Sequence, residues 1–141
     1  MKRALVIDGQ GGGMGAMLVK KLREALPECE IVAVGTNSLA TAAMLRAGAT
    51  CGATGENPVV RNVVDADVIL GPIGIVVADA ILGEVTEKMA AAVGSSRAPK
   101  LLIPVNTCSV RIVGASDAPL SVLTDEAVRR AGEILLRTSP R

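Results

Sequence analysis

The chain has 141 residues, with 15 basic and 14 acidic side chains and a formal net charge of +1. It contains no histidine, tryptophan, tyrosine or phenylalanine, although 50% of its residues are hydrophobic. These absences exclude an imidazole base, a tyrosine acid and a histidine-ligated metal supplied by this chain, and we expect no metal site. Without aromatic stacking platforms or a strongly basic surface, nucleic acid is not an expected partner.

A chain of this length is typical of one domain. Its mean hydropathy of +0.46 predicts either a well-filled core or a homo-oligomer that buries a further apolar patch. Three widely spaced cysteines, Cys29, Cys51 and Cys108, include no C-x-x-C pair and indicate reduced thiols in a cytoplasmic protein. No segment has the pattern of a signal peptide or a membrane span, so a membrane is not an expected partner.

The first third of the chain alternates apolar runs with segments of helical period. A continuous apolar run that ends in a burst of glycine is typical of a strand buried on both faces of a sheet. Pro27 ends the helix that follows, and Ser38 and Gly48 are expected to cap the second helix at its two ends. In chain order we predict strand 4–7, helix 14–26, strand 31–34 and helix 39–47.

The rest of the chain begins with an ambiguous stretch and then resumes the alternation. Residues 50–55 are expected to be a loop of small residues with at most one short strand. Pro58 can begin a short helix over residues 58–64, although the same residues also fit an extended segment. Further along we predict strand 68–70, helical stretches 75–82 and 86–93, strand 101–103, a fifth strand 110–113 and a last helix 119–136.

Strands separated by helices at this spacing predict a parallel sheet with crossover helices on both of its faces. We therefore expect residues 1–141 to form a single small Rossmann-like α/β domain. Its sheet would be doubly wound and mostly parallel, with about five strands.

A glycine-rich loop separates the first strand from the first helix. Gly11-x-Gly13-x-x-Ala16 matches the dinucleotide-binding fingerprint, and Gly9-x-x-x-Gly13-x-Gly15 resembles the loop of short-chain dehydrogenases. In both patterns, glycines let a phosphate approach backbone N–H groups at the positive end of a helix. We expect a small anionic ligand, above all a nucleotide such as NAD or NADP, unless the glycines only let the helix pack tightly on the sheet. The predicted binding residues are Gly9, Gln10, Gly11, Gly12, Gly13 and Met14.

The loop departs from the dinucleotide pattern in two respects. The acidic residue that holds the ribose about 20 positions further on is missing, and Gly35-Thr36-Asn37 stands there instead. This leaves open NADP with Arg46 as a phosphate partner, a mononucleotide, or a ligand without ribose. Asp8 would repel a phosphate unless it is turned away, protonated or paired. Either it binds a ligand hydroxyl or Mg²⁺, or, in the favoured interpretation, it caps the N–H groups of the loop.

The remaining binding residues are predicted from topology, because ligands of open α/β sheets bind beyond the carboxyl ends of the strands. Small or uncharged polar residues follow the predicted strands, so we expect a crevice that binds its ligand through backbone groups and amides, with a base between Ile73 and Ile75. Turns are rich in these residue types in any fold. Besides the glycine loop, the crevice would include Gly35, Thr36, Asn37, Gly71, Pro72, Ile73, Gly74 and Asn106.

Candidate catalytic residues are few. Without histidine or tyrosine, proton or group transfer falls to a carboxylate, a lysine or a thiol, and the candidates are Asp8, Glu56 and Cys108. Each of them also has a simple structural interpretation, so a nucleotide-binding sensor or accessory protein is the favoured function. The alternatives are a small enzyme whose site is completed across a homo-oligomer interface, and a structural oligomer without a ligand.

Five motifs along the chain carry a family resemblance. They are Asp8-Gly9-Gln10-Gly11-Gly12-Gly13, Gly35-Thr36-Asn37, Gly52-Ala53-Thr54-Gly55-Glu56-Asn57, Gly71-Pro72-Ile73-Gly74 and Ile103-Pro104-Val105-Asn106. Together they resemble the successive motifs of domain of unknown function 3842, a family of short bacterial proteins. The resemblance covers nearly the whole chain and implies a bacterial, stand-alone, cytoplasmic protein, without implying an activity. The first third is more distantly similar to dinucleotide-binding Rossmann domains, from which only the loop glycines carry over.

Overall fold

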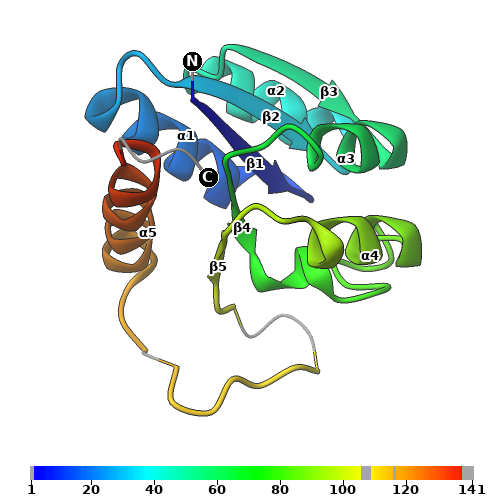
Figure 1. Ribbon diagram of the computed structural model, residues 1–141. Coiled ribbons are helices and arrows are strands. Elements are labelled where there is room, and N and C mark those ends of the chain that lie inside the picture. Colours follow the sequence, from blue (N-terminus) through cyan, green and yellow to red (C-terminus); the bar gives the residue numbers. More distant parts are fainter. Residues whose placement is uncertain (1, 106–108, 116, 138–141) are drawn as a thin grey trace.

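Five parallel strands form the sheet on which the chain is built (Figure 1). The computed structural model describes residues 2–105, 109–115 and 117–137. The strands are β1 (Arg3–Asp8), β2 (Glu30–Gly35), β3 (Cys51–Thr54), β4 (Val68–Pro72) and β5 (Lys100–Ile103). They lie side by side in the order β3-β2-β1-β4-β5, which is the order of Rossmann folds and confirms the predicted fold class.

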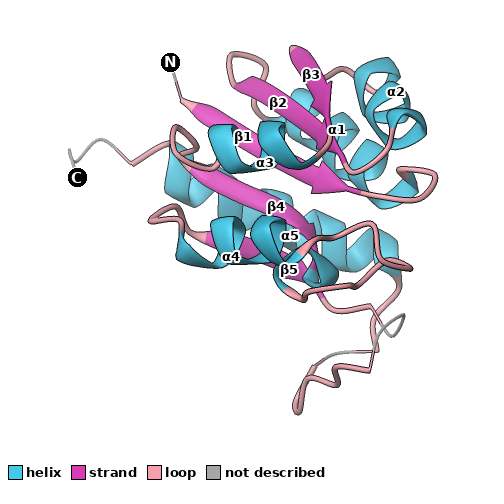
Figure 2. Cartoon of the chain, turned by 90° about the vertical axis from the view of Figure 1, so that its right-hand side faces the viewer, coloured by secondary structure: helices cyan, strands magenta, loops and turns pink. Residues whose placement is uncertain are grey.

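Helices cover both faces of this sheet. They are α1 (Gly13–Ala25), α2 (Ser38–Arg46), α3 (Glu56–Asn62), the 3-10 helix η1 (Ile73–Val76), α4 (Glu87–Ser95) and α5 (Leu120–Leu135). On one face α1, α2 and α5 pack against alternate strand residues such as Ala4 and Val6. On the other face, which carries α3 and α4 in Figure 2, the intervening residues Leu5 and Ile7 are buried. Strands buried on both faces explain the continuous apolar runs of the sequence.

The fifth strand is not the one that the sequence predicts. Residues 110–113 are irregular, and Val113 is fully exposed. The fifth strand is instead β3, where Cys51–Thr54 pairs with β2 over four residues from Val32 to Gly35. A β-branched segment needs a neighbouring strand to pair with, whereas small residues at an edge become a strand once such a neighbour is present.

The predicted helical stretch 75–82 is also wrong. It reduces to η1 and a series of turns, because Asp79, Ile81 and Leu82 have positive φ angles of 65°, 56° and 52°. Left-handed residues cannot continue a right-handed helix. The ambiguous segment 58–64 lies mostly within α3 and is therefore helical, not extended.

Helix α2 begins one residue earlier than expected and has a different cap. Asn37, not Ser38, is its N-cap, and the Asn37 side chain accepts a hydrogen bond from the Ala40 N–H.

Every helix within the described ranges is too short or too polar to cross a bilayer.

Candidate functional site

The carboxyl ends of β1 and β4 mark the point where the chain reverses direction across the sheet. From β1 the chain moves outward to β2 and β3, and it then crosses back to place β4 on the other side of β1. Ligands of doubly wound folds bind at this switch point. Three connections meet here: the glycine loop (residues 9–12), the β2–α2 turn, and the arm, our name for residues 77–86, which join η1 to α4.

The glycine loop forms a tight turn that leads directly into α1. The N–H of Gly12 donates to the carbonyl of Gly9 at 2.9 Å, and Gly12 has a left-handed φ of 74°. A Cβ at Gly12 would lie 2.7 Å from the Cα of Ala40 in α2. This position therefore requires glycine for its conformation and for close packing. At Gly12 the glycine thus has the structural role of allowing tight packing, in this case against α2.

The Asp8 side chain holds the glycine loop in place through two hydrogen bonds. Its side chain is 6% exposed, with Oδ1 accepting from the N–H of Gly9 at 2.8 Å and Oδ2 from the N–H of Gly15 at 2.7 Å. The structure thus places Asp8 as the local cap that the favoured interpretation describes. Burial raises the pKa of Asp8; the two N–H donors oppose this rise, and the charge of Glu84 adds to it.

Two N–H groups at the start of α1 remain available to an anion. Among the described residues, the N–H groups of Gly13 and Met14 have no hydrogen-bond acceptor. A Cβ built at Gly11 or at Gly13 would meet no atom within 4 Å, so the space before these residues is open. An open helix N-terminus with free donors is suited to a phosphate or a carboxylate.

A carboxylate from the arm occupies the neighbouring donors. Oε1 of Glu84 accepts from the N–H of Gln10 at 3.0 Å, from Oγ1 of Thr36 at 2.5 Å and from Nδ2 of Asn37 at 2.8 Å. Nδ2 of Asn37 also donates to the Gln10 carbonyl at 2.8 Å, which ties the β2–α2 turn to the glycine loop. Burial pushes the pKa of Glu84 upward, but the hydrogen bonds from Thr36, Gln10 and Asn37 outweigh it and leave the pKa lowered.

Glu84 is the site residue that sequence reasoning missed. It lies 48 residues beyond Thr36 in the chain and two residues after the end of the stretch 75–82 that was predicted to be helical. Gly83 offered a turn signal, but no local pattern places a lone glutamate against a loop formed so much earlier. Thr36, Asn37 and Gln10 were predicted, and the structure brings them together.

Several predicted crevice residues are part of the scaffold. Gly35 and Gly71 are buried, and a Cβ at either position would collide with Thr41 or with the Ile7 carbonyl. Pro72 ends β4, and Gly74 lies in η1; both are buried. Ile73 borders a cavity of about 200 Å³, whose other lining residues come from the β5–α5 connection: Pro104, Val105, Val110, Arg111, Ile112, Ala115 and Asp117.

Two ligand-contact predictions are wrong. Ile75 is 1% exposed and belongs to the apolar core, so it cannot lie against a nucleotide base. Arg46 is in the last turn of α2, which runs from the carboxyl end of β2 back toward the start of β3, so it lies at the opposite edge of the sheet from the glycine loop.

The remaining catalytic candidates gain no support. Glu56 accepts a hydrogen bond from Oγ1 of Thr86, the N-cap of α4, at 2.7 Å and so links α3 to α4. Asn106 and Cys108 lie outside the described residues. Within the described ranges, no three acidic or cysteine side chains come together as a metal site.

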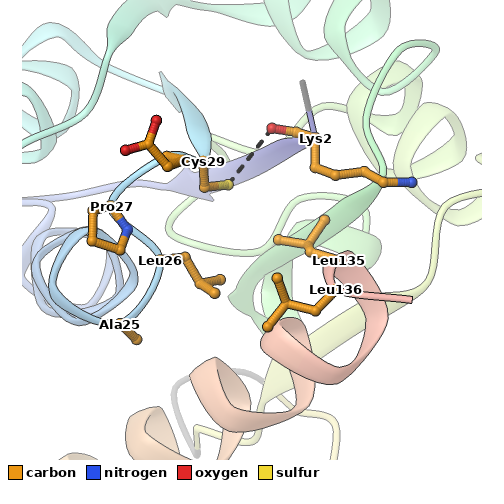
Figure 3. Close-up of a pocket in the computed structure, with 8 residues that line it drawn as sticks. Lys2, Ala25, Leu26, Pro27, Cys29, Leu135 and Leu136 are labelled. Atoms are coloured by element: carbon orange, nitrogen blue, oxygen red, sulfur yellow. Dashed lines mark hydrogen bonds between the residues drawn. The ribbon is translucent and has the colours of Figure 1, made fainter. Parts of the chain in front are cut away.

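An apolar cavity lies elsewhere, at the amino ends of the strands. It measures about 490 Å³ and is lined by the end of α1, by Cys29, by Leu135 of α5 and by Leu136, the C-cap of that helix (Figure 3). Its walls are mainly apolar, the Cys29 thiol donates to the Lys2 carbonyl at 3.7 Å, and burial raises the pKa of that thiol. A thiol with a raised pKa is a poor nucleophile at neutral pH, so the cavity offers no reactive cysteine.

Comparison with known proteins supports the resemblance seen in the motifs. The model of a family described as Domain of unknown function (DUF3842) matches residues 3–136. No curated protein matches the sequence. A solved structure that is similar is the dodecameric FMN-dependent UbiX-like decarboxylase from Escherichia coli O157:H7, at 18% sequence identity and a TM-score of 0.47, covering 92% of this chain and 76% of that chain.

Proposed function

The chain belongs to the DUF3842 family, whose name assigns no activity, and from the site we propose that it binds a phosphate-bearing nucleotide such as NAD or NADP. The observation that carries this proposal is the pair of N–H groups, of Gly13 and Met14, that have no acceptor among the described residues and face open space at the switch point of the sheet. Backbone donors at a helix N-terminus are suited to a phosphate group.

Donors from the next loop extend the binding surface. Thr36 and Asn37 stand where a dinucleotide fold places its acidic ribose ligand. Both donate to the Glu84 carboxylate, and Asn37 also donates to the Gln10 carbonyl of the glycine loop. The Asn37 carbonyl oxygen already accepts from the Ala40 N–H, so Asn37 offers its amide donor here, and a donor suits a phosphate oxygen. Within the proposed class of ligands, this arrangement therefore favours NADP, which carries an additional phosphate group, or a mononucleotide over NAD.

We favour a sensor or accessory role over catalysis. The carboxylates of Asp8 and Glu56, two of the three candidate catalytic groups, accept hydrogen bonds from the protein's own donors. A general base must instead reach a proton of the substrate. The alternative is a small enzyme whose site is completed by a neighbouring copy across a homo-oligomer interface.

A thermal-shift panel of NAD, NADP, FMN, ADP and inorganic pyrophosphate tests the proposal. A ligand at 100 times its Kd stabilises a folded protein by about 2.7 kcal/mol, which for a domain of this size raises the Tm by roughly 10 °C. We expect at least one nucleotide to produce such a shift.

Two matched glycine variants locate the binding. Gly13→Val places methyl groups in the open space before α1, and Gly94→Val does the same in α4, where a Cβ also meets no atom within 4 Å. We expect Gly13→Val to abolish the shift and Gly94→Val to retain it. The proposal fails if no nucleotide shifts the Tm of the wild type, or if both variants respond alike.

A further inference from the structure

The arm carries an unusual density of strained backbone. Asp79, Ile81 and Leu82 all have left-handed φ angles, although none of them is glycine. This region is uncommon for any residue with a side chain and is a marked outlier for β-branched Ile81. Such a conformation persists only where surrounding contacts impose it, so the contacts of the arm identify what holds it in place.

The base of the arm is well anchored, whereas its tip is not. Ala80 and Val85 are buried, and the N–H of Asp79 donates to the Val85 carbonyl at 2.8 Å. The tip residue Leu82 is 92% exposed. Between tip and base, the contacts that reach the glycine loop come from Glu84 and from Ile81, which both lie against Gly9.

The Glu84 carboxylate is held as a bound ligand would be. Its three donors come from the two loops that follow β1 and β2, and all three converge on one oxygen atom. Convergent donors from separate loops at a switch point form an oxyanion-binding arrangement. An oxygen of a phosphate group could occupy the same place only if Glu84 left it. Two negatively charged oxygens that compete for the same three donors would repel each other strongly at such close range.

We propose that Glu84 is an internal competitor, which occupies an oxyanion subsite formed by Gln10, Thr36 and Asn37 until a phosphate-bearing ligand displaces it. Strain in the neighbouring left-handed residues Asp79, Ile81 and Leu82 lowers the cost of rearranging the arm when Glu84 leaves the subsite. The subsite would thus hold a second anionic group of the ligand, next to the phosphate at Gly13 and Met14. This inference rests on the proposed function and adds to it a means of regulation.

Calorimetric titration with NADP, FMN and inorganic pyrophosphate tests the competition in Glu84→Ala and Glu84→Gln. If the closed arm predominates by about ten to one, removing the competitor should tighten binding about tenfold, since the apparent Kd is inversely proportional to the fraction of competent protein. Glu84→Gln, which keeps an acceptor but loses the charge, should give a smaller gain. The control is Glu87→Ala, which removes an exposed glutamate of α4 three residues away and should leave the Kd unchanged.

Hydrogen exchange supplies a second measurement on the wild-type protein. The N–H groups of Gly83 and Val85 bond within the arm, to the carbonyls of Asp79 and Ala80. Ligand should accelerate their exchange if it displaces the arm. Slower exchange would mean that the arm closes onto the ligand and would overturn the competitor model.

The outcomes separate this inference from the proposed function. Equal or weaker binding by Glu84→Ala, with binding by the wild type intact, overturns the internal competitor and leaves the nucleotide site standing. Binding by neither protein overturns both. Tighter binding by Glu84→Ala, with faster exchange in the liganded wild type, supports both.

Discussion

The glycine loop and the arm meet over Gly9, but the two segments are held in opposite ways. The glycine loop takes its left-handed turn at Gly12, packs against α2, and is fastened from inside by the buried Asp8 carboxylate. The arm places side-chain-bearing residues in the left-handed region, exposes its tip and reaches the loop through a partly exposed carboxylate, that of Glu84.

This contrast distinguishes a rigid segment from a movable one. We call the glycine loop together with Asp8 the frame, and the movable segment is the arm. Local opening costs least where few apolar side chains are buried and strain is relieved. The glycine loop has the properties of a preorganised site, because its donors are aligned before any ligand arrives. The arm has the properties of a segment that can move aside.

The largest expected effect is the loss of the frame in Asp8→Ala. This change leaves the N–H groups of Gly9 and Gly15 without their acceptor and should lower the free energy of unfolding by about 2 kcal/mol. Urea denaturation measures it. Asp125→Ala, which breaks an exposed ion pair with Lys21, should change stability by less than about 1 kcal/mol. Equal costs for the two variants would show that Asp8 does not fasten the loop.

A smaller effect of opposite sign is expected from Leu82→Asn in the arm. Asparagine tolerates the left-handed region, and a leucine that is 92% exposed loses little burial, so the free energy of unfolding should rise by about 0.5–1 kcal/mol. The matched control is Leu39→Asn in α2, where leucine is 72% exposed but helical. In that helix the substitution should lower the free energy of unfolding by about 0.5 kcal/mol. A loss of stability in both variants would argue against strain in the arm.

The smallest effect is a pH dependence that differs in sign between the two carboxylates. The pKa of Glu84 is lowered in the folded protein, so its contribution to stability is present above about pH 4.3 and is lost as the pH falls through the folded-state pKa. The pKa of Asp8 is raised, so its contribution is full below about pH 3.9 and is lost as the pH rises through the folded-state pKa.

Denaturation curves between pH 3 and pH 7 measure both effects. As the pH rises, the stability difference between wild type and Glu84→Gln should widen, and that between wild type and Asp8→Asn should narrow. Parallel changes in the two differences would contradict the assignment of one carboxylate to the frame and the other to the arm.

Much of the fold could be predicted because its signals are local. β1, β2 and β4 are runs of apolar residues, and α1 and α5 show the helical period, so each is legible from its own segment. β3 is not, because Cys51–Thr54 carries almost no apolar pattern and becomes a strand only by pairing with β2. The apolar residues 110–113 fail as a strand for the converse reason, since no neighbour pairs with them in the described structure.

The candidate site likewise has parts that local sequence predicts and parts that depend on long-range contacts. The order of strand, glycines and helix was sufficient to predict the glycine turn and the open helix N-terminus at Gly11 to Met14, because that geometry depends on adjacent residues. The exclusion of Arg46 and Ile75 required the direction of α2 and the packing of the core. Glu84 could be found only in three dimensions.

By itself, then, the sequence determined the Rossmann-like class, the aliphatic core and the position of the glycine loop, because hydrophobic period and glycine content act over a few residues. Only the tertiary structure decided which strand completes the sheet, which way Asp8 faces and which carboxylate lies over the loop. These depend on contacts between segments tens of residues apart, such as Thr36 and Glu84, whose hydrogen bond no local pattern encodes.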